Sequence, residues 1–290
     1  MQLVVITGAT SGIGQGAAQR LLAQGHEVVA GTRGTPVPAG VREEMLDLSS
    51  LASVRDFAAR MPQNINALVL NAGTQVYSLD ERSSDGFELT FAVNHLAHYL
   101  LARLLITNLA NGGRIILTSS GTHDPLEKTG VPAPHHADAA RLADPATDPQ
   151  AGKSGITAGL RAYSSSKLCN LMTARTLAMR SEIIDRLITV HAYDPGYIPA
   201  TKLGRNAPWP VRNVVMPVIA KLPMGKGANL LSDGAQALAG LADGSIDSDR
   251  IYMALRGGHP TWPQPSALAC DDALCAKLWA DSAAMVGLPG

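Results

Sequence analysis

Short, nearly continuous runs of apolar residues alternate along the chain with longer stretches of helical periodicity. Continuous apolar runs are typical of strands buried on both faces, and their alternation with helices predicts a parallel sheet. We therefore expect an α/β fold, a single doubly wound, Rossmann-type parallel sheet with helices on both faces. The expected strands are residues 3–7, 28–32, 45–48, 67–70, 114–118, 189–192 and 251–253. The expected helices are residues 13–24, 51–60, 85–110, 162–180, 228–242 and 271–286.

Two segments interrupt this alternation. Between about 121 and 159, prolines, a glycine and scattered histidines and aspartates give no sustained periodicity, which predicts a long irregular insertion. From about 197 to 227, five prolines are mixed with Trp209, Met216 and Met224, which predicts a segment that covers an apolar substrate. A length of 290 residues is compatible with one large core, so residues 1–290 are predicted to form a single domain.

The charges are balanced, with 24 Lys and Arg against 24 Asp and Glu. No strong net field draws the protein to nucleic acid or to an anionic membrane, so neither is expected as a partner. The chain starts without a basic region, and no apolar run reaches the roughly 20 residues of a membrane span, so a cytoplasmic location is expected. The three cysteines, Cys169, Cys270 and Cys275, are too few for a disulfide framework and lack the spacing of a zinc site.

A glycine-rich turn follows the first expected strand. The segment from Thr7 to Gly14 reads TGATSGIG and leads directly into an amphipathic helix. Glycines at such a turn let the backbone approach a pyrophosphate closely, and the free N–H groups of the helix N-terminus then bind it. The position of the turn therefore predicts a dinucleotide cofactor.

This TGxxxGxG spacing resembles the classical short-chain dehydrogenase/reductase family, and further matches extend along most of the chain. Asp47-Leu48 matches the family's aspartate beside the adenine ring, Asn71-Ala72-Gly73 its NAG signature, and Pro195-Gly196 the turn whose backbone approaches the nicotinamide amide. Thr201 or a backbone group near Ile198 would complete that last contact. The cofactor-binding residues that we expect are Gly8, Thr10, Ser11, Gly12, Ile13, Gly14, Arg33, Asp47, Leu48, Asn71, Ala72, Gly73, Tyr163, Lys167, Pro195, Gly196, Ile198 and Thr201.

The end of the second strand indicates which cofactor is used. An acidic residue there would bind the adenosine ribose and repel a 2′-phosphate, whereas an arginine accommodates that phosphate. The strand ends in Gly31-Thr32-Arg33, with Thr32 where the acid would stand. The sequence therefore favours NADP(H), with Arg33 as the phosphate ligand and Thr32 as a possible assistant. The alternative is that Arg33 is an ordinary solvated surface residue.

The sharpest chemical feature is the pair Tyr163 and Lys167. Positions i and i+4 share one face of a helix, so the phenol and the ammonium can point into one pocket. A free tyrosine has a pKa near ~10, and lowering it by about three units requires roughly 4 kcal/mol, comparable to one cation at ~4 Å. Lys167 is the expected source of that cation, and oxidised nicotinamide is expected to add to it. A tyrosine and a lysine one turn apart are also common on ordinary helix surfaces, so the pair predicts an active site only together with the other residues around it.

Those surroundings match the same family. Ser120 ends an expected strand, as that family's catalytic serine does, with Ser119 as the alternative register, and Asn94 lies where the family places its active-site asparagine. The resemblance implies that Tyr163 is the general acid/base, that Ser120 polarises the carbonyl, that Lys167 stabilises the phenolate and binds the ribose, and that Asn94 holds a proton-relay water. The expected catalytic residues are Asn94, Ser120, Tyr163 and Lys167.

The insertion lies between Ser120 and Tyr163, where most members of the family have only a short stretch. In carbonyl-reductase-like members, such a segment covers the helix face that others use to form tetramers, so a monomer is favoured over a homo-oligomer. A proline-rich loop does not promise the convergent geometry of metal ligands, so no metal is expected. The histidines and aspartates that we therefore interpret as solvated loop residues are His123, Asp124, His135, His136 and Asp138.

The sequence is thus interpreted as an NADP(H)-dependent oxidoreductase that moves a hydride between the nicotinamide and the carbonyl or alcohol of a fairly apolar, bulky substrate. One alternative is reduction of an activated C=C bond, because the segment from Tyr163 to Asn170, including Cys169, resembles protochlorophyllide reductases. A second alternative is a non-catalytic NADP(H)-binding sensor. The intact tyrosine, lysine, serine and asparagine argue against a sensor, which has no need for a polarised proton donor.

Overall fold

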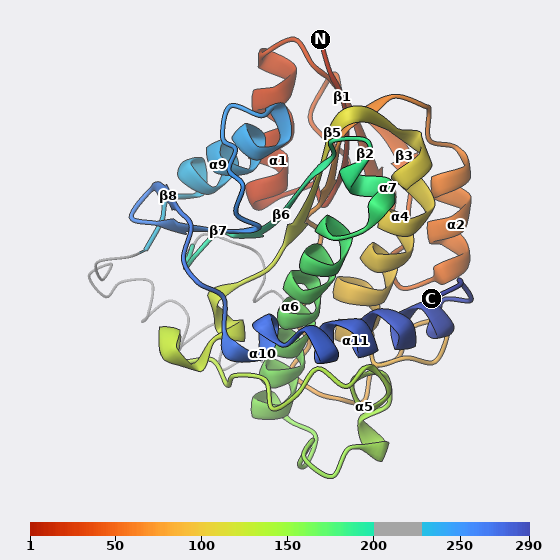
Figure 1. Ribbon diagram of the computed structural model, residues 1–290, viewed down its shortest axis with the longest axis vertical. Coiled ribbons are helices and arrows are strands. Elements are labelled where there is room, and N and C mark those ends of the chain that lie inside the picture. Colours follow the sequence, from red (N-terminus) through yellow and green to blue (C-terminus); the bar gives the residue numbers. More distant parts are fainter. Residues whose placement is uncertain (200–227) are drawn as a thin grey trace.

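An eight-stranded sheet with the order β3-β2-β1-β4-β5-β6-β7-β8 forms the centre of the computed structural model, which describes residues 1–199 and 228–290 (Figure 1). Strands β1 to β7 are parallel to their neighbours, and only β8 runs antiparallel, beside β7. The predicted doubly wound, Rossmann-type α/β fold is therefore confirmed. The strands are β1 Leu3–Thr7, β2 Glu27–Thr32, β3 Arg42–Met45, β4 Ile65–Leu70, β5 Leu109–Thr118, β6 Thr189–Asp194, β7 Tyr252–Arg256 and β8 His259–Thr261.

Helices cover both faces of this sheet (Figure 1). On one face α1 and α9 pack so closely that a Cβ on Gly16 would lie 2.7 Å from the Cβ of Ala235. On the other face α2, α4, α6 and α11 enclose the larger of two apolar cores. The α-helices are α1 Gly12–Ala23, α2 Leu51–Ala59, α3 Leu89–Phe91, α4 Ala97–Leu105, α5 Ala139–Ala143, α6 Ile156–Ala178, α7 Ser181–Ile184, α9 Leu231–Asp243, α10 Ala267–Cys270 and α11 Asp272–Met285.

Several predicted boundaries were wrong, each for a local reason. The third strand was placed at 45–48 but lies at Arg42–Met45, because a charged edge strand carries no apolar run. The short β8 was missed altogether. The helix expected at 85–110 begins at Leu89 and passes through a π-helical turn, Ala92–Leu96, before α4. Helix α6 begins at Ile156, six residues before the predicted 162.

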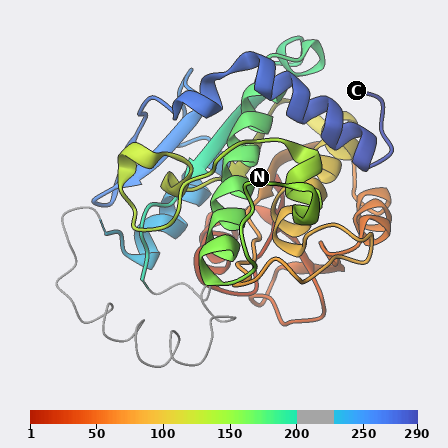
Figure 2. The same cartoon turned by 90° about the horizontal axis from the view of Figure 1, so that it is seen from below.

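The insertion consists of irregular chain with short helical turns and lies beside α6 and α11, as Figure 2 shows from below. Two of its histidines have local partners: Nδ1 of His123 lies 2.7 Å from the carbonyl oxygen of Ser120, and Nε2 of His136 lies 3.0 Å from the Asp148 carboxylate. In the described ranges, no three His, Cys, Asp or Glu side chains gather as a metal site would require. The predicted covering segment at about 197–227 lies outside the described residues from position 200 onward.

One described helical stretch, Leu89–Asn108, is long and apolar enough to cross a membrane by length and composition. In the structure, 78% of its most apolar window is buried inside the protein. The stretch contains α4, which packs against α2 on one side of the sheet. Its apolar composition is thus accounted for by the protein core.

A buried histidine in the π-helical turn predicts sensitivity to acid. His95 is fully buried, its ring centroid lies 5.0 Å from that of Phe91, and its Nε2 lies 2.9 Å from the Ser282 hydroxyl. Burial lowers the pKa of His95 to about 3, below the 6.5 of a free histidine. Between these two pKa values the unfolded chain binds a proton on His95 and the native state does not. The contribution of His95 to the free energy of unfolding is therefore fully present above pH 6.5 and is lost as the pH falls below it.

We expect His95 to remove about 3 kcal/mol from the free energy of unfolding between pH 6.5 and pH 4. Urea unfolding at several pH values in this range, on the wild type and on His95→Gln, measures the effect. The variant keeps a polar partner for Ser282 but has no group that titrates here, so its stability should depend less steeply on pH. Equal slopes for the two proteins would show that His95 does not cause the acid sensitivity.

Candidate active site

A large cleft opens where the carboxyl ends of the parallel strands meet, as expected for a doubly wound sheet. Among the predicted site residues that the structure describes, Asn94 does not line it, because it is fully buried behind its wall. Thr201 lies outside the described residues. The structure brings the others together. The predicted residues that line the cleft are Gly8, Thr10, Ser11, Gly12, Ile13, Gly14, Arg33, Asp47, Leu48, Asn71, Ala72, Gly73, Ser120, Tyr163, Lys167, Pro195, Gly196 and Ile198.

The glycine-rich turn forms one end of this cleft and fits a dinucleotide. Gly12 has a φ of +61° and nothing within 4 Å of where a Cβ would stand, so its backbone faces open space. A Cβ on Gly14 would lie 2.3 Å from the Gly8 carbonyl oxygen, so only glycine allows the turn to close. Helix α1 starts at Gly12, and the Ser11 side chain does not cap it. The first N–H groups of the helix therefore remain available to an anion in the cleft.

The Asn71-Ala72-Gly73 turn is tied to the first strand beside it. Thr7 Oγ1 accepts hydrogen bonds from the backbone N–H groups of Asn71 and Ala72, both at 3.0 Å. A Cβ on Gly73 would lie 3.4 Å from Asn94 Oδ1 and 3.5 Å from Lys167 Nζ. This turn consequently connects the cofactor end of the cleft to the catalytic end.

The residues expected to select the cofactor stand at the end of β2 and β3. Arg33 is exposed, lines the cleft and forms no salt bridge with any residue that the structure describes. The Thr32 hydroxyl turns away, because it donates to the Thr35 carbonyl at 2.9 Å and accepts from the Thr35 N–H at 3.0 Å. Asp47 Oδ1 accepts from both the N–H and the hydroxyl of Ser49. Arg33 is therefore the free cation at this end among the described residues.

Tyr163 and Lys167 lie one turn apart on α6, and both are buried against the cleft. Lys167 Nζ lies 5.6 Å from the centre of the Tyr163 ring and donates to the Thr118 carbonyl at 3.0 Å. Burial lowers the pKa of Lys167 to about 8. The predicted juxtaposition of phenol and ammonium is thus present, while the ammonium is less firmly charged than a free lysine.

The expected lowering of the Tyr163 pKa was wrong for the protein alone. Burial raises the pKa of Tyr163 above its ordinary value, and the negative charge of Asp194 raises it further, while a hydrogen bond with the Ser120 side chain opposes them. A low-dielectric site disfavours the phenolate, and one partly neutral lysine does not offset this. A further positive charge is therefore needed before Tyr163 can act as a base.

The two serines after β5 have different roles in the structure. Ser119 is buried, and its hydroxyl donates to the Lys167 carbonyl at 2.9 Å, which anchors β5 to α6. Ser120 also lines the cleft, where its side chain lies close enough to Tyr163 to lower the pKa of the phenol. Ser120, rather than its neighbour, therefore stands where a substrate oxygen would meet the phenol.

The side chain of Asn94 is fully used within the protein. Its Nδ2 donates to the Thr74 carbonyl at 2.9 Å and to the Ser166 hydroxyl at 3.0 Å, while its Oδ1 accepts from the Thr74 N–H at 2.8 Å. Asn94 sits within the π-helical turn, a distortion that often marks functional positions. The amide thus holds the chain around Gly73, which leaves the backbone carbonyl of Asn94 as the better candidate to hold a water.

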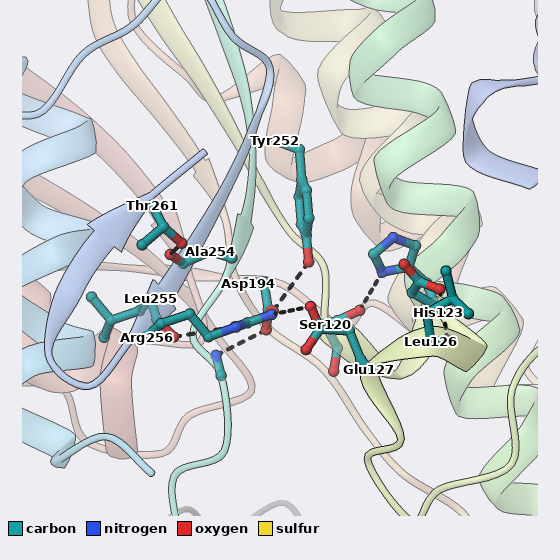
Figure 3. A network of polar contacts seen from close by, with 12 residues as sticks. Ser120, His123, Leu126, Glu127, Asp194, Tyr252, Ala254, Leu255, Arg256 and Thr261 are labelled. Carbon is teal, nitrogen blue, oxygen red and sulfur yellow. Dashed lines mark hydrogen bonds and ion pairs between the residues drawn. The ribbon is translucent and has the colours of Figure 1, made fainter. Parts of the chain in front are cut away.

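Sequence reasoning missed a buried charged network at the end of β6 (Figure 3). Asp194 is fully buried and accepts from Arg256 Nη1 at 2.8 Å and from the Tyr252 hydroxyl at 3.1 Å. Its other oxygen accepts from the Gly196 N–H at 2.8 Å, which fixes the Pro195-Gly196 turn. Arg256 also pairs with Glu127 of the insertion at 3.0 Å. An acidic residue directly before the Pro-Gly pair was the one available signal in the sequence.

The described cleft can now be compared with known proteins. The model of the short chain dehydrogenase family matches residues 2–129. A protein named as a daunorubicin C-13 ketoreductase, from Streptomyces sp. (strain C5), is 36% identical over 309 residues, which cover 98% of this chain and 92% of that protein. A chloroplastic protochlorophyllide reductase of Chlamydomonas reinhardtii is 31% identical over 313 residues, which cover 99% of this chain and 78% of that protein.

Solved structures share the fold. The crystal structure of an uncharacterised protein from Mycobacterium paratuberculosis has a TM-score of 0.72 and 25% identity, covering 100% of this chain and 94% of that one. The crystal structure of BdcA in complex with NADPH has a TM-score of 0.62 and 21% identity, covering 91% and 96% of the two chains. The two relatives from Streptomyces sp. (strain C5) and Chlamydomonas reinhardtii are each more than 30% identical to this chain, and the matches cover more than three quarters of each relative's length. The chain therefore belongs to the short-chain dehydrogenase/reductase family of oxidoreductases.

Proposed function

We propose that the protein is an NADP(H)-dependent reductase of carbonyl groups on fairly apolar molecules, or a dehydrogenase of the corresponding alcohols. The observation that carries this proposal is the meeting of Tyr163, Ser120 and Lys167 in the same cleft as the glycine-rich turn. The relative from Streptomyces, whose name is that of a ketoreductase, supports a carbonyl substrate.

The residues of the cleft divide the chemistry among them. The nicotinamide, when bound, donates the hydride to the carbonyl carbon, and Tyr163 donates its proton to the carbonyl oxygen. The Ser120 hydroxyl orients that oxygen beside the phenol. Because the buried Tyr163 has a raised pKa, it is protonated at neutral pH, and its proton is available to the oxygen that becomes negatively charged as the hydride is added. In the reverse direction, Lys167 would help to stabilise the phenolate, and the positive charge of an oxidised cofactor held in the cleft would add to this stabilisation.

The experiment that tests this proposal is consumption of NADPH, and separately of NADH, with a panel of aldehydes, ketones and enones. Turnover of aldehydes or ketones with NADPH is the expected result. Turnover of enones alone would favour reduction of activated C=C bonds, the chemistry suggested by the likeness to protochlorophyllide reductase. Binding of NADPH without turnover of any compound would favour a sensor. Cys169, which prompted part of the C=C hypothesis, is fully buried in the core and does not line the cleft.

Arg33 provides a separate prediction about the cofactor. Replacing Arg33 with Ala removes the free cation at the end of β2, and a lost charge-assisted hydrogen bond is worth about 1.5–3 kcal/mol. We expect the KM for NADPH to rise by about 10- to 100-fold while the KM for NADH changes little. Steady-state kinetics with both cofactors measure the effect.

Arg42→Ala is the matched control, because Arg42 is an arginine on the adjacent edge strand whose salt bridges are to Glu27 and Glu44. It should leave both KM values unchanged. If Arg33→Ala raised the KM for NADH as much as that for NADPH, Arg33 would not be the ligand of a 2′-phosphate.

A further inference from the structure

A second buried histidine, His98, makes two contacts that the proposed chemistry does not use. His98 lies on α4, one turn after Asn94, and is fully buried. Its Nδ1 lies 3.0 Å from the backbone carbonyl oxygen of Asn94, and its Nε2 lies 3.0 Å from Thr7 Oγ1. The ring therefore joins the carbonyl of the predicted catalytic asparagine to the first strand.

The direction of every hydrogen bond in this chain follows from its neighbours. The Asn94 carbonyl can only accept, so Nδ1 of His98 carries the proton and Nε2 is an acceptor. Thr7 Oγ1 accepts from the N–H groups of Asn71 and Ala72, so its own proton points to His98 Nε2. The hydrogen bonds from Asn71 and Ala72 through Thr7 and His98 to Asn94 can all form only if the imidazole is neutral. Burial and the positive charge of Lys167 lower the pKa of His98 to about 4, which keeps the ring neutral at neutral pH.

One end of this set of hydrogen bonds lies at the cleft, and the other end, at Asn94, is buried behind its wall. At one end, Ala72 precedes Gly73, which faces Asn94 Oδ1 and Lys167 Nζ. At the other end, the Asn94 carbonyl lies in the π-helical turn, where the regular ladder of i to i+4 hydrogen bonds is interrupted. A carbonyl oxygen has two lone pairs, and His98 engages one of them. The ring thereby fixes the direction in which the other lone pair can hold a water.

We propose that His98 is a positioning residue that connects the cofactor turn at Asn71-Ala72 to the carbonyl of Asn94, so that both are held in one arrangement. The proposal rests on the proposed function, because the Asn94 carbonyl matters only if a proton must be relayed to Tyr163 and Lys167. His98 itself does not touch the reacting atoms. An apolar side chain would fill the same space but would leave the Thr7 hydroxyl without its buried partner and the Asn94 carbonyl undirected.

Two conservative variants test the two ring nitrogen atoms of His98 separately. His98→Asn keeps an amide donor near the position of Nδ1, and His98→Gln keeps an amide oxygen near the position of Nε2. We expect His98→Asn to keep kcat within about threefold and to weaken NADPH binding about tenfold, because the Thr7 hydroxyl loses its acceptor. We expect His98→Gln to show the opposite split, with NADPH binding kept and kcat lowered about tenfold, because the Asn94 carbonyl loses its donor. His98→Leu should suffer both losses.

The measurements are the Kd for NADPH from cofactor fluorescence, kcat from steady-state turnover, and thermal unfolding of each variant. His95→Gln is the matched control, since His95 is an equally buried histidine three residues earlier that contacts Ser282 rather than Thr7. It should change neither Kd nor kcat. Parallel losses in His98→Asn and His98→Gln, or unchanged Kd and kcat in His98→Leu, would overturn the proposal.

The binding measurement keeps this test separate from the test of the proposed function. If the wild type binds NADPH without turnover, the proposed function fails, yet the Kd values of His98→Asn and His98→Gln still report whether the ring supports the cofactor turn. A tenfold difference between those two Kd values would then uphold the cofactor half of the coupling. Equal values would overturn it, and a wild type that binds no NADPH at all would overturn both proposals.

Discussion

Replacing Tyr163 with Phe is expected to lower kcat by about 10³-fold, which corresponds to about 4 kcal/mol of transition-state stabilisation. The change removes only the hydroxyl, which is the group that the proposed reaction uses to donate or accept a proton. The phenyl ring keeps the packing of a side chain that is only 8% exposed. NADPH binding should therefore remain close to that of the wild type. Steady-state kinetics and a fluorescence titration with NADPH together separate loss of chemistry from loss of binding.

Tyr77→Phe is the matched control for this experiment, because Tyr77 also lines the cleft. Its loss of a hydroxyl should change kcat by less than about threefold, since no proton transfer is assigned to it. If Tyr163→Phe kept a tenth or more of the wild-type kcat, the proton would have to come from another group. Equal effects of the two substitutions would indicate that the cleft responds to any lost hydroxyl.

Replacing Arg256 with Met is expected to lower the free energy of unfolding by about 4 kcal/mol, because removal of one partner leaves a buried charge uncompensated. Asp194 is fully buried, so water does not replace the lost guanidinium. The same change should also affect catalysis. The charge of Asp194 raises the pKa of Tyr163, and without Arg256 nothing of opposite sign offsets it as closely. The pH required for alcohol oxidation should therefore rise.

Urea unfolding and the pH profile of alcohol oxidation measure the two effects. In Glu127→Gln, the control variant, Arg256 loses its half-exposed partner but keeps Asp194, and this should cost less than about 1 kcal/mol. The double variant Asp194→Asn with Arg256→Met should be more stable than Arg256→Met alone, because no charge is left buried. A loss below about 1 kcal/mol in Arg256→Met would mean that the pair contributes little to the fold.

The central strands and the cofactor turn could be predicted because their determinants are local. Strand β1 and the glycine-rich turn follow one another in the sequence, and the apolar run before Gly8 needs no knowledge of the fold. Tyr163 and Lys167 share a helix face for the same reason, since four positions make about one turn. Patterns with short range in the sequence thus identified residues at both ends of the cleft.

The remaining features depend on contacts between distant segments, which no local pattern records. Asp194 and Arg256 meet only because β6 and β7 are neighbours in the sheet. The raised pKa of Tyr163 in the protein alone depends on burial and on that same carboxylate, and neither could be predicted from a local pattern. The π-helical turn at Asn94 interrupts a stretch whose composition favours one continuous helix.

The two edge strands of the sheet affect how readily copies of the protein aggregate. An edge strand offers unpaired backbone groups to any passing strand, and charges or proline at the edge discourage such pairing. Strand β3 presents Arg42, Glu43 and Glu44 in succession, and Arg42 lies within salt-bridge distance of Glu44 and of Glu27 on β2. Strand β8 spans three residues, with Pro260, which has no N–H to donate, at its centre. A sheet bounded in this way is a poor template for edge-to-edge aggregation at high protein concentration.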